Sequence, residues 1–109
     1  MASIVVALTS SPETPAGRRA LALAESLAGQ GHALTVCCLE DAVLLGSDRA
    51  AADARATLGR LLDRGARCVV LADDLALRGL RQDGSAVAVD HAGLVAILTA
   101  DHDRALGAF

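Results

Sequence analysis

Three cysteines are the side chains in this sequence that are best suited to act as nucleophiles. Cys37 and Cys38 are neighbours in an apolar run, and Cys68 lies within another. A thiol becomes a nucleophile when a helix N-terminus or a nearby cation lowers its pKa. The pair is followed instead by the acids Glu40 and Asp41, which disfavour a thiolate. Free cysteine also packs well as a small apolar side chain, so a structural role is favoured and a reactive one stays open.

Two adjacent acids, Asp73 and Asp74, form a second candidate, either as a general acid–base pair or as a cation site. The favoured alternative is that Asp73 caps a helix and Asp74 is an acid of its first turn, which suits the helix dipole. The histidines, His32, His91 and His102, have no evident partner and are expected to be solvated. The chain has no C-x-x-C and no zinc-like spacing of histidines and cysteines, so it predicts neither a metal site nor a bound cofactor.

A third candidate is a small anion-binding loop at Thr9, Ser10 and Ser11. The helix start that follows, at Thr14–Ala16, offers backbone N–H groups that could hold an anion. Neither a G-x-G-x-x-G motif nor a Walker lysine is present, so the usual phosphate-binding loops are excluded.

Alternating strands and helices must position these residues. Short apolar runs predict strands, and segments with apolar residues at helical spacing predict helices capped by Thr14, Asp48, Asp73 and Asp90. The expected strands cover residues 3–9, 33–39, 67–72, 86–89 and 104–109; the expected helices cover residues 15–28, 49–64, 73–80 and 90–99, with a helical turn at 41–46. This alternation is typical of βαβ units. We therefore expect an α/β fold, with three α/β/α layers and a mainly parallel sheet of four or five strands.

Ligands of open α/β sheets bind beyond the carboxyl ends of the strands. That rule selects Thr9–Ser11, Cys37–Asp41 and Ala72–Asp74. Cys37 and Cys38 should point to opposite faces of the sheet, because side chains alternate along a strand.

Composition limits the classes of function. The 109 residues fit a single domain, 1–109, whose formal net charge is −3 and whose one aromatic residue is Phe109. Scattered arginines and the lack of stacking aromatics argue against nucleic-acid binding. No apolar run is long enough to span a membrane and no secretory signal opens the chain, so we expect a cytoplasmic protein with reduced thiols. The apolar fraction of 53% indicates either a dense core or a surface covered by a partner chain.

Five segments, taken in their order along the chain, resemble those of the DsrE-like sulfur-relay family. They are Ile4–Pro12, Gly31–Val36, Asp41–Val43, Leu61–Gly65 with Arg78–Leu80, and Asp103–Phe109. The resemblance implies a three-layer α/β/α domain in the cytoplasm that assembles as a trimer or hexamer, or with related subunits. Catalytic members of that family pass sulfur as a cysteine persulfide.

The resemblance also implies where the sulfur-carrying residue should be. It lies six residues after the glycine that precedes the third strand, which is Gly65 here, and that position is Leu71. Leucine cannot carry sulfur. The chain is therefore expected to be a non-catalytic subunit acting through partner contacts, or a sulfur carrier that uses a relocated Cys38 or Cys37. A module that binds a small anionic ligand in the crevice formed by Thr9–Ser11, Leu71 and Asp73 is the third possibility.

Overall fold

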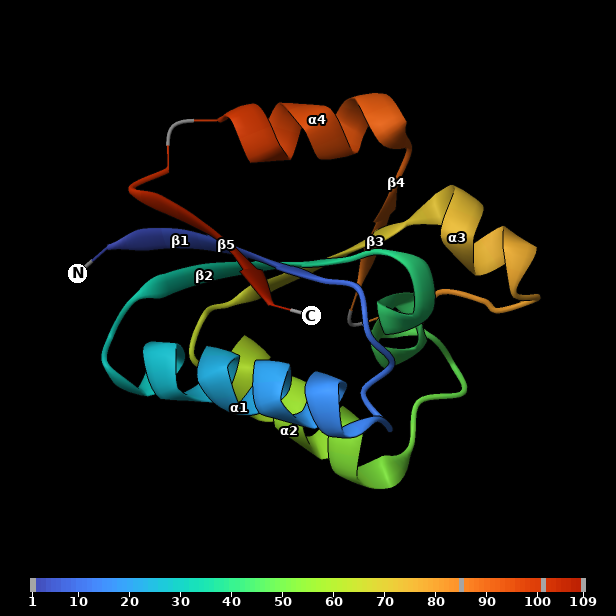
Figure 1. Ribbon diagram of the computed structural model, residues 1–109, viewed down its shortest axis with the longest axis horizontal. Coiled ribbons are helices and arrows are strands. Elements are labelled where there is room, and N and C mark those ends of the chain that lie inside the picture. Colours follow the sequence, from blue (N-terminus) through green and yellow to red (C-terminus); the bar gives the residue numbers. More distant parts are fainter. Residues whose placement is uncertain (1, 85, 101, 109) are drawn as a thin grey trace.

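Five parallel strands form the centre of the molecule (Figure 1). The computed structural model describes residues 2–84, 86–100 and 102–108. The strand order is β4-β3-β2-β1-β5, and every neighbouring pair is parallel. The strands are β1 (Ser3–Leu8), β2 (Ala33–Cys38), β3 (Arg67–Leu71), β4 (Val87–Val89) and β5 (Arg104–Ala108). The predicted α/β class and parallel sheet are confirmed.

Helices cover both faces of the sheet, which gives the three expected layers (Figure 1). Two long helices lie side by side on one face, and a single helix crosses the other. A 3₁₀ helix and a short α-helix lie at the carboxyl end of the sheet, on the right of Figure 1. The helices are α1 (Pro15–Gly29), η1 (Glu40–Gly46), α2 (Ala52–Asp63), α3 (Ala72–Leu77) and α4 (His91–Thr99).

Alternation along the strands divides the core into two parts. Val6 and Cys38 belong to the larger part, which packs against α1 and α2. Val5 and Cys37 belong to the smaller part, which packs against Leu94 of α4. The prediction that the two adjacent cysteines face opposite sides of the sheet is therefore confirmed.

Two of the predicted helix caps are present. The Thr14 hydroxyl accepts a hydrogen bond from the Gly17 N–H (3.1 Å), and the Asp90 carboxylate accepts one from the Gly93 N–H (2.7 Å). Such caps satisfy N–H groups that lack a partner inside the helix. They fix where α1 and α4 begin.

The expected cap at Asp48 is wrong. Helix α2 begins at Ala52, and Ala51 precedes it without a side-chain cap. The Asp48 N–H instead donates to the Arg81 carbonyl (2.9 Å), and the Asp48 carbonyl accepts from the Arg55 guanidinium (2.9 Å). Because this backbone pairs with a distant part of the chain, the helix starts three residues later than expected.

Within the described residues, every helix is too short or too polar to cross a bilayer.

Candidate functional site

The carboxyl ends of β2, β3 and β4 are joined by a small polar network. The Asp74 carboxylate accepts a hydrogen bond from the Glu40 N–H (2.7 Å). The Arg78 guanidinium donates to the Asp41 carboxylate (3.0 Å) and to the Asp74 carbonyl (3.2 Å). These contacts tie the start of η1 to α3. The segments after β2 and β3 that the sequence selected therefore do meet.

Asp73 does not cap its helix, so that expectation is wrong. Strand β3 runs directly into α3, and the cap position is taken by the apolar Leu71, without a side-chain hydrogen bond. The Asp73 carboxylate lies 3.2 Å from Nδ1 of His91, and both side chains are largely exposed. An exposed pair of this kind adds little stability, and it joins α3 to the first residue of α4.

Two further residues at this end of the sheet are notable, Leu71 for its burial and Glu40 for its backbone conformation. Leu71, at the position where the resemblance places a sulfur carrier, is buried in the core beneath α4. Glu40 has a φ of 53°, the left-handed region that a non-glycine residue enters at some cost in energy. The Asp74 carboxylate on its N–H helps to hold Glu40 in that conformation.

All three thiols are buried. Cys37 and Cys38 are 0% exposed and Cys68 is 2% exposed. Burial, with a smaller contribution from Cys68, raises the pKa of Cys37 to about 11. A hydrogen bond with Cys68, together with burial, raises the pKa of Cys38 well above its usual range. Both side chains are therefore protonated thiols at neutral pH.

Alkaline pH should destabilise the protein through these thiols. Unfolding returns the pKa of Cys37 from about 11 to its ordinary value of 9.0. The folded state keeps this proton while the unfolded chain loses it, so this stability is complete below pH 9 and is lost as pH rises toward 11. The loss from Cys37 is about 1.4 kcal/mol per pH unit in that window.

Urea unfolding between pH 8 and 11 measures this effect. The sequence has neither lysine nor tyrosine, so cysteines are the side chains that titrate in this range. The variant Cys37→Ala should lose stability with pH less steeply than the wild type. Equal slopes would contradict the prediction.

Ser11, the last residue of the loop at Thr9–Ser11, is engaged in a turn with Glu13 and Thr14. The Ser11 carbonyl accepts hydrogen bonds from the Thr14 N–H (3.0 Å) and the Thr14 hydroxyl (2.8 Å). The Ser11 hydroxyl accepts one from the Glu13 N–H (3.2 Å). Pro15 has no N–H and that of Gly17 is used by the cap, so this helix start offers few donors to an anion. Binding of an anion here stays a prediction.

Each histidine has a partner, contrary to the expectation from the sequence. His91 pairs with Asp73. Nδ1 of His32 accepts a hydrogen bond from the Ala2 N–H (3.1 Å). Nδ1 of His102 lies 3.1 Å from the Ser3 hydroxyl, and Nε2 lies 3.0 Å from the Ile97 carbonyl. Two of these contacts secure the amino end of β1. The described residues include no group of three or more histidine, cysteine or acidic side chains that could hold a metal ion.

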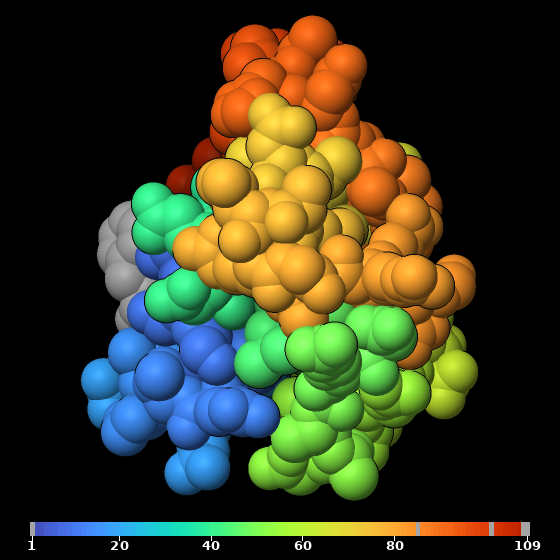
Figure 2. Space-filling view, turned by 90° about the vertical axis from the view of Figure 1, so that its right-hand side faces the viewer, coloured from blue at the N-terminus to red at the C-terminus, as the bar shows by residue number. Residues whose placement is uncertain are grey.

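A hollow of about 400 Å³ lies beside α3. It is lined by Asp73, Ala76 and Leu77, and Leu77 is 80% exposed. Figure 2 views the molecule from the carboxyl end of the strands, and α3 stands out there between α4 above and the α1–α2 layer below. Isolated exposed apolar residues are common, but one beside a hollow is a candidate contact site.

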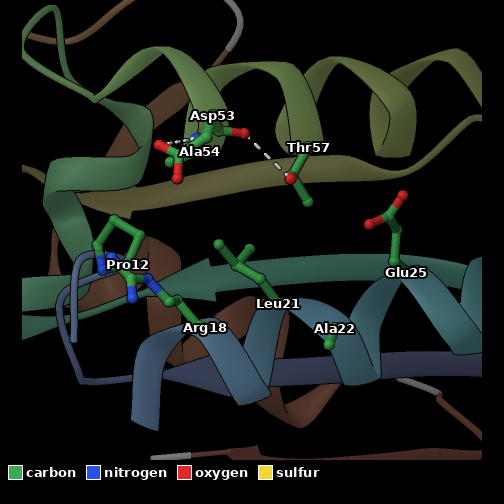
Figure 3. A pocket seen from close by; sticks show the side chains of 8 residues that line it. All are labelled: Pro12, Arg18, Leu21, Ala22, Glu25, Asp53, Ala54 and Thr57. Atoms are coloured by element: carbon green, nitrogen blue, oxygen red, sulfur yellow. Dashed lines mark hydrogen bonds between the residues drawn. The ribbon is translucent and has the colours of Figure 1, made fainter. Parts of the chain in front are cut away.

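A second hollow, of about 190 Å³, lies between α1 and α2 (Figure 3). Its floor is apolar where Leu21 points between the helices. At one end the Arg60 guanidinium donates to both carboxylate oxygens of Glu25 (2.7 and 3.2 Å), and this bond lowers the pKa of Glu25. The residues that line this hollow are Pro12, Arg18, Leu21, Ala22, Glu25, Asp53, Ala54 and Thr57.

A family model described as DsrH-like protein matches residues 14–105. The chain belongs to the DsrH-like family. This family is related to sulfur-relay proteins, and its members act in sulfur-relay complexes with partner subunits. No curated protein matches the sequence.

Two solved structures share the fold of this DsrH-like chain. The ychN protein of E. coli has a TM-score of 0.77 at 19% identity, over 98% of both chains. A conserved protein of unknown function from Bacteroides thetaiotaomicron has a TM-score of 0.72 at 12% identity, over 96% of this chain and 93% of that one. At these identities the likeness establishes the fold alone.

Sequence reasoning missed part of this site. It named Asp73 and Leu71 but not Arg78 as a partner of η1. The spacing of Asp74 and Arg78, four residues apart on α3, is the signal that could have suggested their contact. The contact between Arg78 and Asp41 spans 37 residues, so sequence spacing carries no sign of it.

Proposed function

We propose that this chain is a non-catalytic, DsrE-like subunit of a cytoplasmic sulfur-relay assembly that acts by binding partner subunits. The observation that carries the proposal is the state of its thiols. A sulfur carrier needs an accessible cysteine with a lowered pKa. Here all three cysteines are at most 2% exposed, and Leu71 occupies the position implied by the family resemblance.

The surface of α4 supports a role in assembly. This helix covers one face of the sheet almost alone, and none of its residues is acidic, lysine or arginine. Val95 is 56% exposed and Leu98 is 38% exposed. A helix that is apolar on its outer side as well as its inner side is typical of one that is covered on both. Copies of this chain, in a trimer or hexamer, or related subunits are the partners we expect.

A sulfur carrier that uses Cys38 or Cys37 is the alternative. It would require the core around β2 to open, because a persulfide forms when a thiolate attacks the outer sulfur of a donor persulfide, whose S–S bond breaks and releases the donor thiolate. Such opening should be rare in a native fold with these residues at its centre.

Incubation with a persulfide donor tests the two functions. Intact mass should show no gain of sulfur, about 32 Da per atom, on native wild-type protein, because thiolates are scarce and shielded. The variants Cys37→Ser and Cys38→Ser are measured alongside. A gain that one of them abolishes would establish a relocated sulfur carrier and overturn the non-catalytic role.

A further inference from the structure

Negative charge is concentrated at the end of the sheet where α3 stands out. Five acidic side chains lie in η1, in α3 and at the cap of α4, and one arginine, Arg78, is the C-cap residue of α3; the acids are Glu40, Asp41, Asp73, Asp74 and Asp90. With His91 neutral, five carboxylates and one guanidinium give this end a formal charge of −4. The whole chain carries −3, so the rest of the molecule is +1. These elements therefore carry more net negative charge than the chain as a whole.

An apolar contact point lies within this acidic region. Leu77 is 80% exposed at the end of α3, beside the hollow of about 400 Å³ whose other lining residues are Ala76 and Asp73. Leu77 packs little against its own chain, whereas Leu75 on the same helix is 5% exposed. The surface thus offers a leucine, a space beside it and the Asp73 carboxylate at its edge, with the other acids on the neighbouring elements.

Charge decides between possible occupants of this surface. A second copy related by a two-fold axis would bring two ends of charge −4 together, and like charges across an interface are costly. Contact with another part of a second copy is also weakly favoured, because the rest of the chain has a net charge of only +1, spread over many residues. A segment with basic residues on either side of an apolar one matches both the carboxylates and the hollow.

We propose that this surface, formed by Leu77, the adjacent hollow and the surrounding carboxylates, docks a partner protein through an apolar side chain flanked by arginine or lysine. The inference rests on the proposed function only in assigning the partner to a sulfur-relay assembly. The carboxylates attract the partner and set its orientation, and burial of Leu77 supplies most of the affinity.

Fluorescence anisotropy with a defined peptide tests this docking. The probe is a short labelled peptide with adjacent leucines between pairs of arginines, and its control has glutamate at each arginine. We expect binding of the arginine peptide only, weakened about threefold or more when ionic strength rises from 0.05 to 0.3 M. Leu77→Ala should weaken binding about tenfold. Glu40→Gln and Asp73→Asn should each weaken it about threefold.

Matched variants separate this surface from others on the protein. Leu23 on α1 is also an exposed leucine, at 42%, and Asp63 is an exposed acid at the end of α2. Leu23→Ala and Asp63→Asn should leave the affinity unchanged. Equal losses in the matched variants, equal binding of the glutamate peptide, or no binding of either peptide would overturn the proposal.

Oligomeric state is measured on the same variants by light scattering. Leu77→Asp should leave the number of chains in the wild-type particle unchanged. A smaller particle would mean that a second copy occupies the surface, which also overturns the proposal. Neither result depends on sulfur transfer, so the docking inference and the non-catalytic role can fail separately.

Discussion

Cys37 in the folded protein should react with a maleimide at neutral pH at least about a hundredfold more slowly than in the unfolded chain. The thiolate is the reactive form, and its population falls tenfold for each unit by which the pKa rises. For Cys37 the pKa rises from 9.0 to about 11, which alone accounts for a factor of about one hundred. Burial of the sulfur adds steric protection to this factor.

Intact mass after timed quenching measures the labelling rate, with and without urea. The variant Leu77→Cys is the control for the reagent, because a side chain that is 80% exposed should label quickly in the folded protein. Native wild-type protein should gain label only as fast as it unfolds. Rapid labelling of Cys37 or Cys38 before unfolding would mean that the core opens there, and it would favour the relocated sulfur carrier.

Replacement of Gly17 by alanine should destabilise the protein by about 3 kcal/mol, a cost in the range of severe overpacking. Helix α1 passes so close to the preceding loop that a Cβ at Gly17 would overlap the Ser11 carbonyl oxygen and lie 2.6 Å from the carbonyl carbon. Both atoms belong to the backbone, so no side chain can rotate away. The loop or the start of α1 would have to move.

Gly59 on α2 provides the matched control, because a Cβ there meets no atom within 4 Å. In a helix interior the change from glycine to alanine is favourable, so Gly59→Ala should stabilise the protein by about 0.5–1 kcal/mol. Urea unfolding measures both variants. A cost below about 1 kcal/mol for Gly17→Ala would mean that the loop at Thr9–Ser11 shifts freely.

Much of the fold follows from local sequence patterns. Apolar runs and helical spacing predicted all five strands and the order of the helices, because burial of apolar side chains selects a period of two or 3.6 residues. Thr14 and Asp90 were correctly predicted as caps, since each bonds an N–H three residues away. The period of two also predicted that Cys37 and Cys38 face opposite sides of the sheet.

Other features depended on contacts between distant segments. Asp48 and Asp73 were predicted to cap helices, and neither does. The Asp48 N–H pairs with the Arg81 carbonyl, and α3 follows β3 without a loop, so that Asp73 lies inside the helix. The burial of both adjacent cysteines likewise required helices on both faces of the sheet.

The sequence by itself determined the α/β class, the order of elements and the presence of Leu71 where the family resemblance implies a sulfur carrier. The tertiary structure decided that Cys37 and Cys38 are protonated and that all three thiols are shielded. It also decided that η1 and α3 meet through Asp41, Asp74 and Arg78, and that Leu77 is exposed beside Asp73. The physical reason is the range of the interactions. Secondary structure reflects neighbours within a few residues, whereas the pKa of a buried thiol and the charge of a surface depend on segments that come together only when the sheet assembles.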